Sequence, residues 1–310
     1  MAARKTAAGL FMACAAMLAT GCGLGAGTPS GELSLRVTEN FGTQQLGHLS
    51  SAKAGGEETA MRQLQRGHSV GTRFSGRFVQ SVNGKSAGNE SGKPVDWFFF
   101  VNGVESPTGA AETVLHAGDS VWWDRRDWSQ AVHVPAVVGS WPQPFRSGLK
   151  GKRLPVRIIC APGFERECDA VEALLAKQGV TASRGLAGIA GRGSGLRLLV
   201  GDWKALGHDP TGSLLESGPG LSGVYAKPSA NGQSIALLNA GGQVAAQFGA
   251  GSGLVAATNE GDAQPTWIVS GTDHSGVGRA ISALNASTLA SRYAVVIAPD
   301  GSVHPAPETN

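Results

Sequence analysis

The stretch from Asp119 to Trp128 holds residue types that are suited to binding chemistry. It reads DSVWWDRRDW, and five of the seven Trp of the chain lie between Trp97 and Trp141, although only 6% of all residues are aromatic. A Trp beside an Arg offers a stacking face, cation–π contacts and hydrogen-bond donors, a combination typical of binding hot spots. The pattern predicts either a ligand platform or, alternatively, the core of a small domain that has few other large side chains to bury.

A second aromatic run, DWFFFVNG from Asp96 to Gly103, is expected to form a strand beside this stretch. Alternate side chains of a strand face opposite sides, so both faces of this strand would be apolar. It is then covered on both sides, or one face meets a ligand or a partner. In a further alternative, the Asp and Arg residues of the first stretch only pair with one another at a solvated edge. The residues predicted to contact a ligand are Trp97, Phe98, Phe100, Asn102, Trp122, Arg125 and Trp128.

The cluster that most resembles a catalytic site is Thr272–Ser275, which reads TDHS where a predicted strand meets a predicted helix. Open sheets bind ligands at such places. Thr, Asp and Ser are also the residues that cap helices, and capping is the preferred interpretation. The sequence contains no Gly-x-Ser-x-Gly elbow, P-loop or dinucleotide fingerprint. We therefore expect a protein without catalytic residues or a cofactor.

The first residues indicate export. A basic start precedes an apolar run over residues 7–19, which is typical of a secretory signal and too short to span a bilayer. The run ends in LATGC, which resembles the bacterial lipobox, so residues 1–21 are predicted to be a signal peptide and Cys22 to carry the lipid. An ordinary signal peptide with an incidental Cys is the alternative. We expect an extracellular protein that is lipid-anchored to the outer face of the bacterial cytoplasmic membrane.

Two cysteines remain in the body of the exported chain. Cys160 and Cys168 form an even pair in an oxidising compartment, which favours a disulfide. No Cys-x-x-Cys motif or His cluster accompanies them, so no metal site is expected. Removal of residues 1–21 leaves 24 Lys and Arg against 23 Asp and Glu. This near-neutral balance gives no reason to expect a nucleic acid partner.

The elements that must position these residues divide into two predicted domains. Residues 32–145 are expected to form the first, with strands at 33–38, 76–84 and 97–101 and a short helix that ends at Gly67. A flexible tether is expected at 22–31 and a linker, rich in Gly and basic residues, at 146–154. The second domain is expected at 155–300, followed by a disordered tail at 301–310.

The second domain alternates apolar runs with amphipathic segments. PVRIICAP is followed by a helical pattern, and LRLLVGDW, QSIALLN and PTWIVSG are further candidates for buried strands. The last of these leads into a helical pattern and then into RYAVVIAPDG, a strand–helix–strand order typical of parallel sheets. This order predicts a three-layer α/β domain with a largely parallel sheet.

The first domain also resembles a known family. The segments LQRGHSVGTRFSGRFVQSVNG, DWFFFVNGVESPTGA and LHAGDSVWWDRRDW are similar to DUF4430, which is itself similar to the C-terminal domain of transcobalamin and intrinsic factor. The resemblance implies an α+β, β-grasp-like fold, an extracellular setting and a soluble ligand. In the vertebrate relatives that ligand is cobalamin.

Three classes of function follow from these observations. The first is a receptor or transport accessory that binds a cobalamin-like or other cofactor-sized nutrient, with a membrane transporter as its possible partner. The second is a surface protein that holds envelope proteins or glycans by its aromatic patch. The third is an enzyme that uses the second domain.

Overall fold

The computed structural model describes residues 32–51, 58–74, 76, 78–186, 195–261 and 263–309. The predicted signal peptide, Cys22 and the predicted tether lie outside the described residues. The elements of the first half are β1 (Leu33–Glu39), β2 (Gln44–Ser51), α1 (Ala60–Gly67), β3 (Val70–Arg73), β4 (Phe78–Val82), β5 (Lys85–Ser86), β6 (Gly88–Glu90), β7 (Lys93–Val101), β8 (Val104–Glu105) and β9 (Ser120–Asp127).

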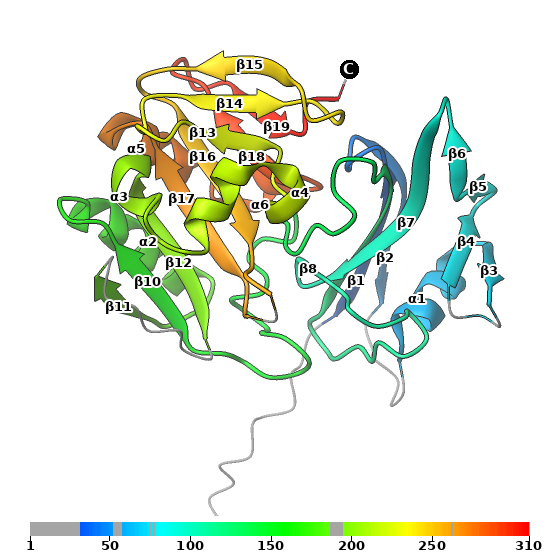
Figure 1. Cartoon of the computed structure of the whole chain (residues 1–310). Coiled ribbons are helices and arrows are strands. Elements are labelled where there is room, and N and C mark those ends of the chain that lie inside the picture. The colour runs from blue at the N-terminus through cyan, green and yellow to red at the C-terminus, as the bar shows by residue number, and fades with distance from the viewer. Residues whose placement is uncertain are drawn as a thin grey trace, which may run out of the picture.

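The second half continues the element order after a long irregular connection. Its elements are β10 (Val156–Cys160), α2 (Glu165–Lys177), β11 (Ala182–Leu186), β12 (Leu196–Asp202), α3 (Trp203–Leu206), η1 (Gly212–Ser217), α4 (Pro219–Ser222), β13 (Ala226–Pro228), β14 (Ile235–Leu238), β15 (Val244–Phe248), β16 (Gly253–Thr258), β17 (Thr266–Gly271), α5 (His274–Ser282), α6 (Ala286–Leu289), β18 (Ala294–Ile297) and β19 (Val303–Ala306). Figure 1 shows the two halves side by side.

The main sheet of the first half has the strand order β2-β1-β9-β7-β6, with β8 also paired to β7. β1 is antiparallel to β2 and parallel to β9, so both of its edges are bonded. Its alternating sequence LSLRVTE buries Leu35 and Val37 on the face that packs with Leu64 of α1. β3, β4 and β5 form a separate small sheet.

The fold class predicted from the sequence is wrong. The described part of the chain is mostly β-sheet, with 39% of its residues in strands and 19% in helices, and its sheets are mixed. In the seven-stranded sheet, β11, β10, β12 and β17 run parallel, but β16, β18 and β19 join antiparallel. The segment QSIALLN contributes β14 to a separate antiparallel sheet of β13, β14 and β15.

Connection length explains this error. Only residues 259–265 join β16 to β17, and so short a link permits an antiparallel neighbour but no parallel crossover. Strand β16 thereby lies between β17 and β18, the two strands expected to be neighbours. The predicted disordered tail is also corrected, because β19 pairs with β18 from Val303 to Ala306.

The two halves share one large hydrophobic core. Phe41, Phe100 and Trp122 of the first half belong to the same buried cluster as Tyr225 and Tyr293 of the second. The connection takes part as well, since Trp141 and Phe145 contact the ring of Trp267, with centroid distances of 5.6 and 5.2 Å. A smaller cluster fills the space between the first sheet and α1. The sheet of the first half is therefore covered on both faces.

Candidate functional site: an aromatic groove beside strand β7

The aromatic residues of β7 and β9 divide between the two faces of their sheet. On the α1 face, Phe99 and Trp123 stack with a centroid distance of 4.6 Å. On the opposite face, Phe100 and Trp122 lie 5.7 and 5.2 Å from the ring of Tyr293 in the second half. The aromatic side chains of β7 and β9 thus mainly belong to the two hydrophobic clusters on opposite faces of their sheet. The remaining question is which of these side chains a ligand could still contact.

Three residues predicted to contact a ligand lie in the interior instead. Trp122 is 1% exposed, and Phe100 and Asn102 are fully buried. Asn102 has a structural task, because its Nδ2 donates to Asp119 Oδ1 at 2.7 Å and its Oδ1 accepts from Ser120 N at 2.9 Å. These bonds fix the turn between β7 and β8, so the sequence-based assignment of these three residues to a ligand site is corrected.

The other predicted residues lie in different places. Trp97 and Phe98 line an aromatic groove, whereas Arg125 lines a separate polar pocket. Trp128 is partly exposed beyond the end of β9, and its backbone N–H donates to Pro94 O at 3.1 Å. The structure therefore brings together only Trp97 and Phe98 of the predicted set.

The aromatic groove encloses about 410 Å³. Strand β7 forms one wall, the start of β4 a second, and the loop after β8 a third. Its lining residues are Phe78, Val79, Asp96, Trp97, Phe98, Phe99, Glu105, Ser106, Pro107, Thr108, Gly109, Ala110, Glu112 and Trp123. The groove has this shape because β6 pairs with β7 only up to Val95 and β8 only from Phe100. Among the described strands, none covers that edge of β7 between these points.

One polar group on the groove lining lacks a partner. Trp123 is 2% exposed, and its indole Nε1 has no hydrogen-bond partner among the described residues. The indole of Trp97 donates to Lys85 O at 3.0 Å, and that of Trp122 donates to Thr38 Oγ1 at 2.7 Å. Buried Trp N–H groups usually find such an acceptor. An acceptor atom from a bound molecule would satisfy the remaining one.

The charges on the groove lining are all negative. Asp96, Glu105 and Glu112 line it, and none of the described lining residues is Lys, Arg or His. Glu105 is held in place, because its carboxylate accepts from Val134 N at 2.6 Å and lies 3.2 Å from His133 Nδ1. Asp96 Oδ1 accepts from Trp97 N at 2.7 Å. The groove lining therefore combines aromatic residues with three carboxylates.

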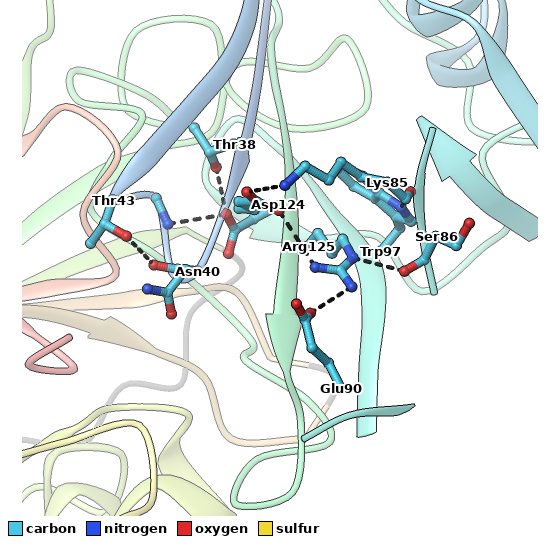
Figure 2. A network of polar contacts seen from close by, with 11 residues as sticks. Thr38, Asn40, Thr43, Lys85, Ser86, Glu90, Trp97, Asp124 and Arg125 are labelled. Atoms are coloured by element: carbon cyan, nitrogen blue, oxygen red, sulfur yellow. Dashed lines mark hydrogen bonds and ion pairs between the residues drawn. The ribbon is translucent and has the colours of Figure 1, made fainter. Parts of the chain in front are cut away.

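A second cavity of about 460 Å³ lies near the far end of β1 and is polar. Figure 2 shows the network beside it, in which Arg125 donates to Glu90 Oε2 at 2.7 Å and Lys85 to Glu39 Oε1 at 2.8 Å. Arg125 also lies 3.4 Å from Glu39 Oε2 and donates from Nε to Ser86 O at 2.8 Å. The carboxylates and cations that line this polar pocket pair with one another. Fewer of its charged groups are therefore available to bind a ligand than in the aromatic groove.

Asp124, also in Figure 2, joins the two halves of the molecule. Its carboxylate accepts from Thr38 Oγ1 at 2.5 Å, Gly42 N at 3.0 Å and Tyr293 Oη at 2.8 Å. Burial raises the pKa of Asp124 to about 6, against the opposing effect of these hydrogen bonds. One alternative from the sequence placed Asp124 at a solvated edge, and the structure shows it buried instead, since nothing in its local pattern reveals the distant Tyr293.

Local contacts test two further predictions, the capping of the last long helix and the disulfide. Asp273 caps α5 through a bond from Gly276 N to its Oδ1 at 2.9 Å, which confirms the capping interpretation of Thr272–Ser275. His274 lies on the surface, 2.9 Å from Glu167 Oε1. The disulfide between Cys160 and Cys168 is confirmed and links the end of β10 to the first turn of α2.

The described part of the chain holds no group of three or more His, Cys, Asp or Glu residues arranged to bind a metal ion. Its helices include none long and apolar enough to cross a membrane.

The fold and the groove define a mostly β-sheet protein with an aromatic cavity in its first half. Residues 57–126 match the sequence model of DUF4430, a domain of unknown function, which confirms the family resemblance over that segment. All the residues that line the groove fall inside it. A search of curated proteins finds no match.

Among solved structures, a protein from Ruminococcus gnavus, titled a "putative metal binding protein", is similar to part of the chain. The alignment has 16% identity and a TM-score of 0.25, and it covers 31% of this chain and 97% of the other. A similarity at this level carries no argument about the function of this protein.

Proposed function

We propose that this protein is a membrane-anchored envelope lipoprotein that binds a small soluble ligand in the aromatic groove beside β7. The observation that carries the proposal is an aromatic cavity that includes Trp123, whose buried indole N–H has no acceptor among the described residues. Leaving such a donor unsatisfied costs about 1–3 kcal/mol, and a ligand that supplies the acceptor recovers this energy.

The volume of the groove limits the size of the ligand that it can hold. Its volume of about 410 Å³ lies in the lower part of the range of roughly 300–1,000 Å³ that is usual for small-molecule sites. This volume favours a ligand smaller than cobalamin. The role is that of a receptor or transport accessory, with lipid at Cys22 holding the protein at the outer face of the membrane, and it includes no catalytic step.

Trp123→Phe tests the proposal, because it keeps an aromatic ring against Phe99 and removes only the N–H donor. Protein purified under native conditions is first examined by mass spectrometry for a bound molecule, and then screened for compounds that raise its melting temperature. The variant is expected to bind the identified compound more weakly by about 0.5–1.5 kcal/mol and to unfold at a similar temperature.

Trp122→Phe is the matched control, since Trp122 does not line the groove and its indole N–H already has Thr38 Oγ1 as an acceptor within the protein. This variant is expected to lose stability without a selective loss of affinity. A Trp123→Phe protein that binds as tightly as wild type, or a screen in which no compound binds near Trp123, would contradict the proposed site.

A further inference from the structure

We infer that the ligand of the groove carries a positive charge, as a compact ammonium or quaternary ammonium compound with an acceptor oxygen. This inference rests on the proposed function, because it names the class of ligand for the same groove. Three features of the lining carry it: the sign of its charges, its aromatic walls and the partnerless N–H of Trp123.

The sign of the charges excludes a preference for anions. Asp96 and Glu112 are exposed carboxylates on the lining, and Glu105 adds a third that is anchored by Val134 N. None of the described lining residues offers a compensating cation. An anion in the groove would meet like charges on several sides, whereas a cation gains from each of them.

The aromatic walls favour the same ligand. Phe78, Trp97, Phe99 and Trp123 line the groove, and a cation over an aromatic face is attracted by the negative potential of the ring. One lining residue already makes such a contact within the protein, because the guanidinium of the buried Arg126 lies 3.8 Å from the ring centre of Phe98. Aromatic residues joined to carboxylates are a combination that recognises quaternary ammonium groups.

The lip of the groove extends this aromatic surface into solvent. Phe78 lines the groove and is 62% exposed, and Phe74, which is 72% exposed, meets it edge to face with a centroid distance of 5.7 Å. They are well placed to cover the methyl groups of a bound ammonium compound.

The third feature, the N–H of Trp123, indicates which group the ligand needs besides its positive charge. A cation alone satisfies the carboxylates and the rings, but it cannot accept a hydrogen bond from Trp123 Nε1. The ligand therefore needs a hydroxyl, ether or carbonyl oxygen near its charged group. Choline has both parts, and 3,3-dimethylbutan-1-ol has the same shape without the charge, which makes the two compounds a matched pair of probes.

The experiment follows the indole N–H resonance of Trp123 in the ¹⁵N-labelled chain from residue 22 onward, with the disulfide intact. Trp123→Phe assigns this resonance by removing it. Choline and n-butylammonium are titrated at low ionic strength beside 3,3-dimethylbutan-1-ol and an anion, butyrate. Choline is expected to shift the resonance and to saturate, with the neutral alcohol at least ten-fold weaker and butyrate weaker still.

A charge variant adds an independent test. Asp96→Asn combined with Glu112→Gln removes two negative charges from the groove, and the Asn retains an oxygen for Trp97 N. This double variant is expected to bind choline about ten-fold more weakly, with binding of the neutral alcohol unchanged. Glu32→Gln, an exposed residue that does not line the groove, is the control and is expected to leave both affinities unchanged.

Different results would overturn the inference of a charged ligand and the proposed function of the groove. Equal affinity for choline and the neutral alcohol, or an unchanged affinity in the double variant, overturns the charge inference and leaves the groove as a ligand site. If none of the four probes and no compound from the wider screen shifts the Trp123 resonance, both the charge inference and the proposed function are overturned.

Discussion

At the scale of single residues, the buried carboxyl group of Asp124 makes the free energy of unfolding depend on pH. Its pKa is about 6 in the folded protein, against 3.8 ordinarily, because burial disfavours the carboxylate. The folded state therefore holds the proton more tightly than the unfolded state between these two pH values. The contribution of this proton to the free energy of unfolding is fully present below pH 3.8 and is lost as the pH rises to about 6.

We expect Asp124→Asn to remove this dependence. Relative to the variant, the free energy of unfolding of the wild type should fall by about 3 kcal/mol as the pH rises through this window, and the difference should then stay constant. Denaturant titrations of both proteins at closely spaced pH values measure this. Asp300→Asn is the control, since hydrogen bonds from Ser302 lower the pKa of Asp300 and its effect has the opposite sign. If the difference in unfolding free energy between wild type and Asp124→Asn does not change with pH, the raised pKa of Asp124 is contradicted.

At the scale of elements, strand β9 places neighbouring Trp side chains in two different cores. Trp122 contacts Tyr293 of the second half, and Trp123 stacks on Phe99 over α1. We expect Trp122→Ala and Trp123→Ala each to cost about 3–5 kcal/mol through cavity formation. The partly exposed Trp128 is the control, and Trp128→Ala should cost clearly less. Denaturant melts of the three variants decide the matter, and a small cost at Trp122 would show that the halves are not held together there.

Sequence patterns predicted local features well and pairings poorly. The alternation in β1, the capping of α5 and the bond between Cys160 and Cys168 follow from short-range rules, and the structure contains all three. The mixed second sheet was missed because β16 was not among the predicted strands, and a short apolar run has the same composition in parallel and antiparallel sheets. Only the brief connection to β17 distinguishes them.

The site was predictable only in part, for the same reason. Trp97 and Phe98 stood out because aromatic residues are rare in this chain. Phe78 and Glu112 gave no comparable signal, since they reach the groove from β4 and from the loop after β8. The burial of Trp122 could not be foreseen, because Tyr293, which covers it, is far away in the sequence.

At the scale of the whole molecule, attachment to the membrane is expected to depend on one residue. The described helices include none that could span a bilayer, and Cys22 follows a run that resembles a lipobox. We expect Cys22→Ala to release the protein, because acyl chains would supply the attachment. Fractionation of cells into membrane and soluble material measures this, with Cys160→Ala as a control that should remain at the membrane. Unchanged detergent partitioning of Cys22→Ala would contradict the anchor.

The position of β1 would determine how a protein anchored at Cys22 bears mechanical load. The predicted tether leads directly into β1, which pairs in parallel with β9 from Ser34–Ser120 to Glu39–Arg125. A pull on the anchor against a load held at the far end of β9 acts along both strands. Bonds of a β-ladder run across the strand direction, so such a pull shears them together rather than opening them one after another. A molecule held in the groove, whose lining includes Trp123 of β9, would thus be connected to the membrane through a strand pairing that is loaded in shear.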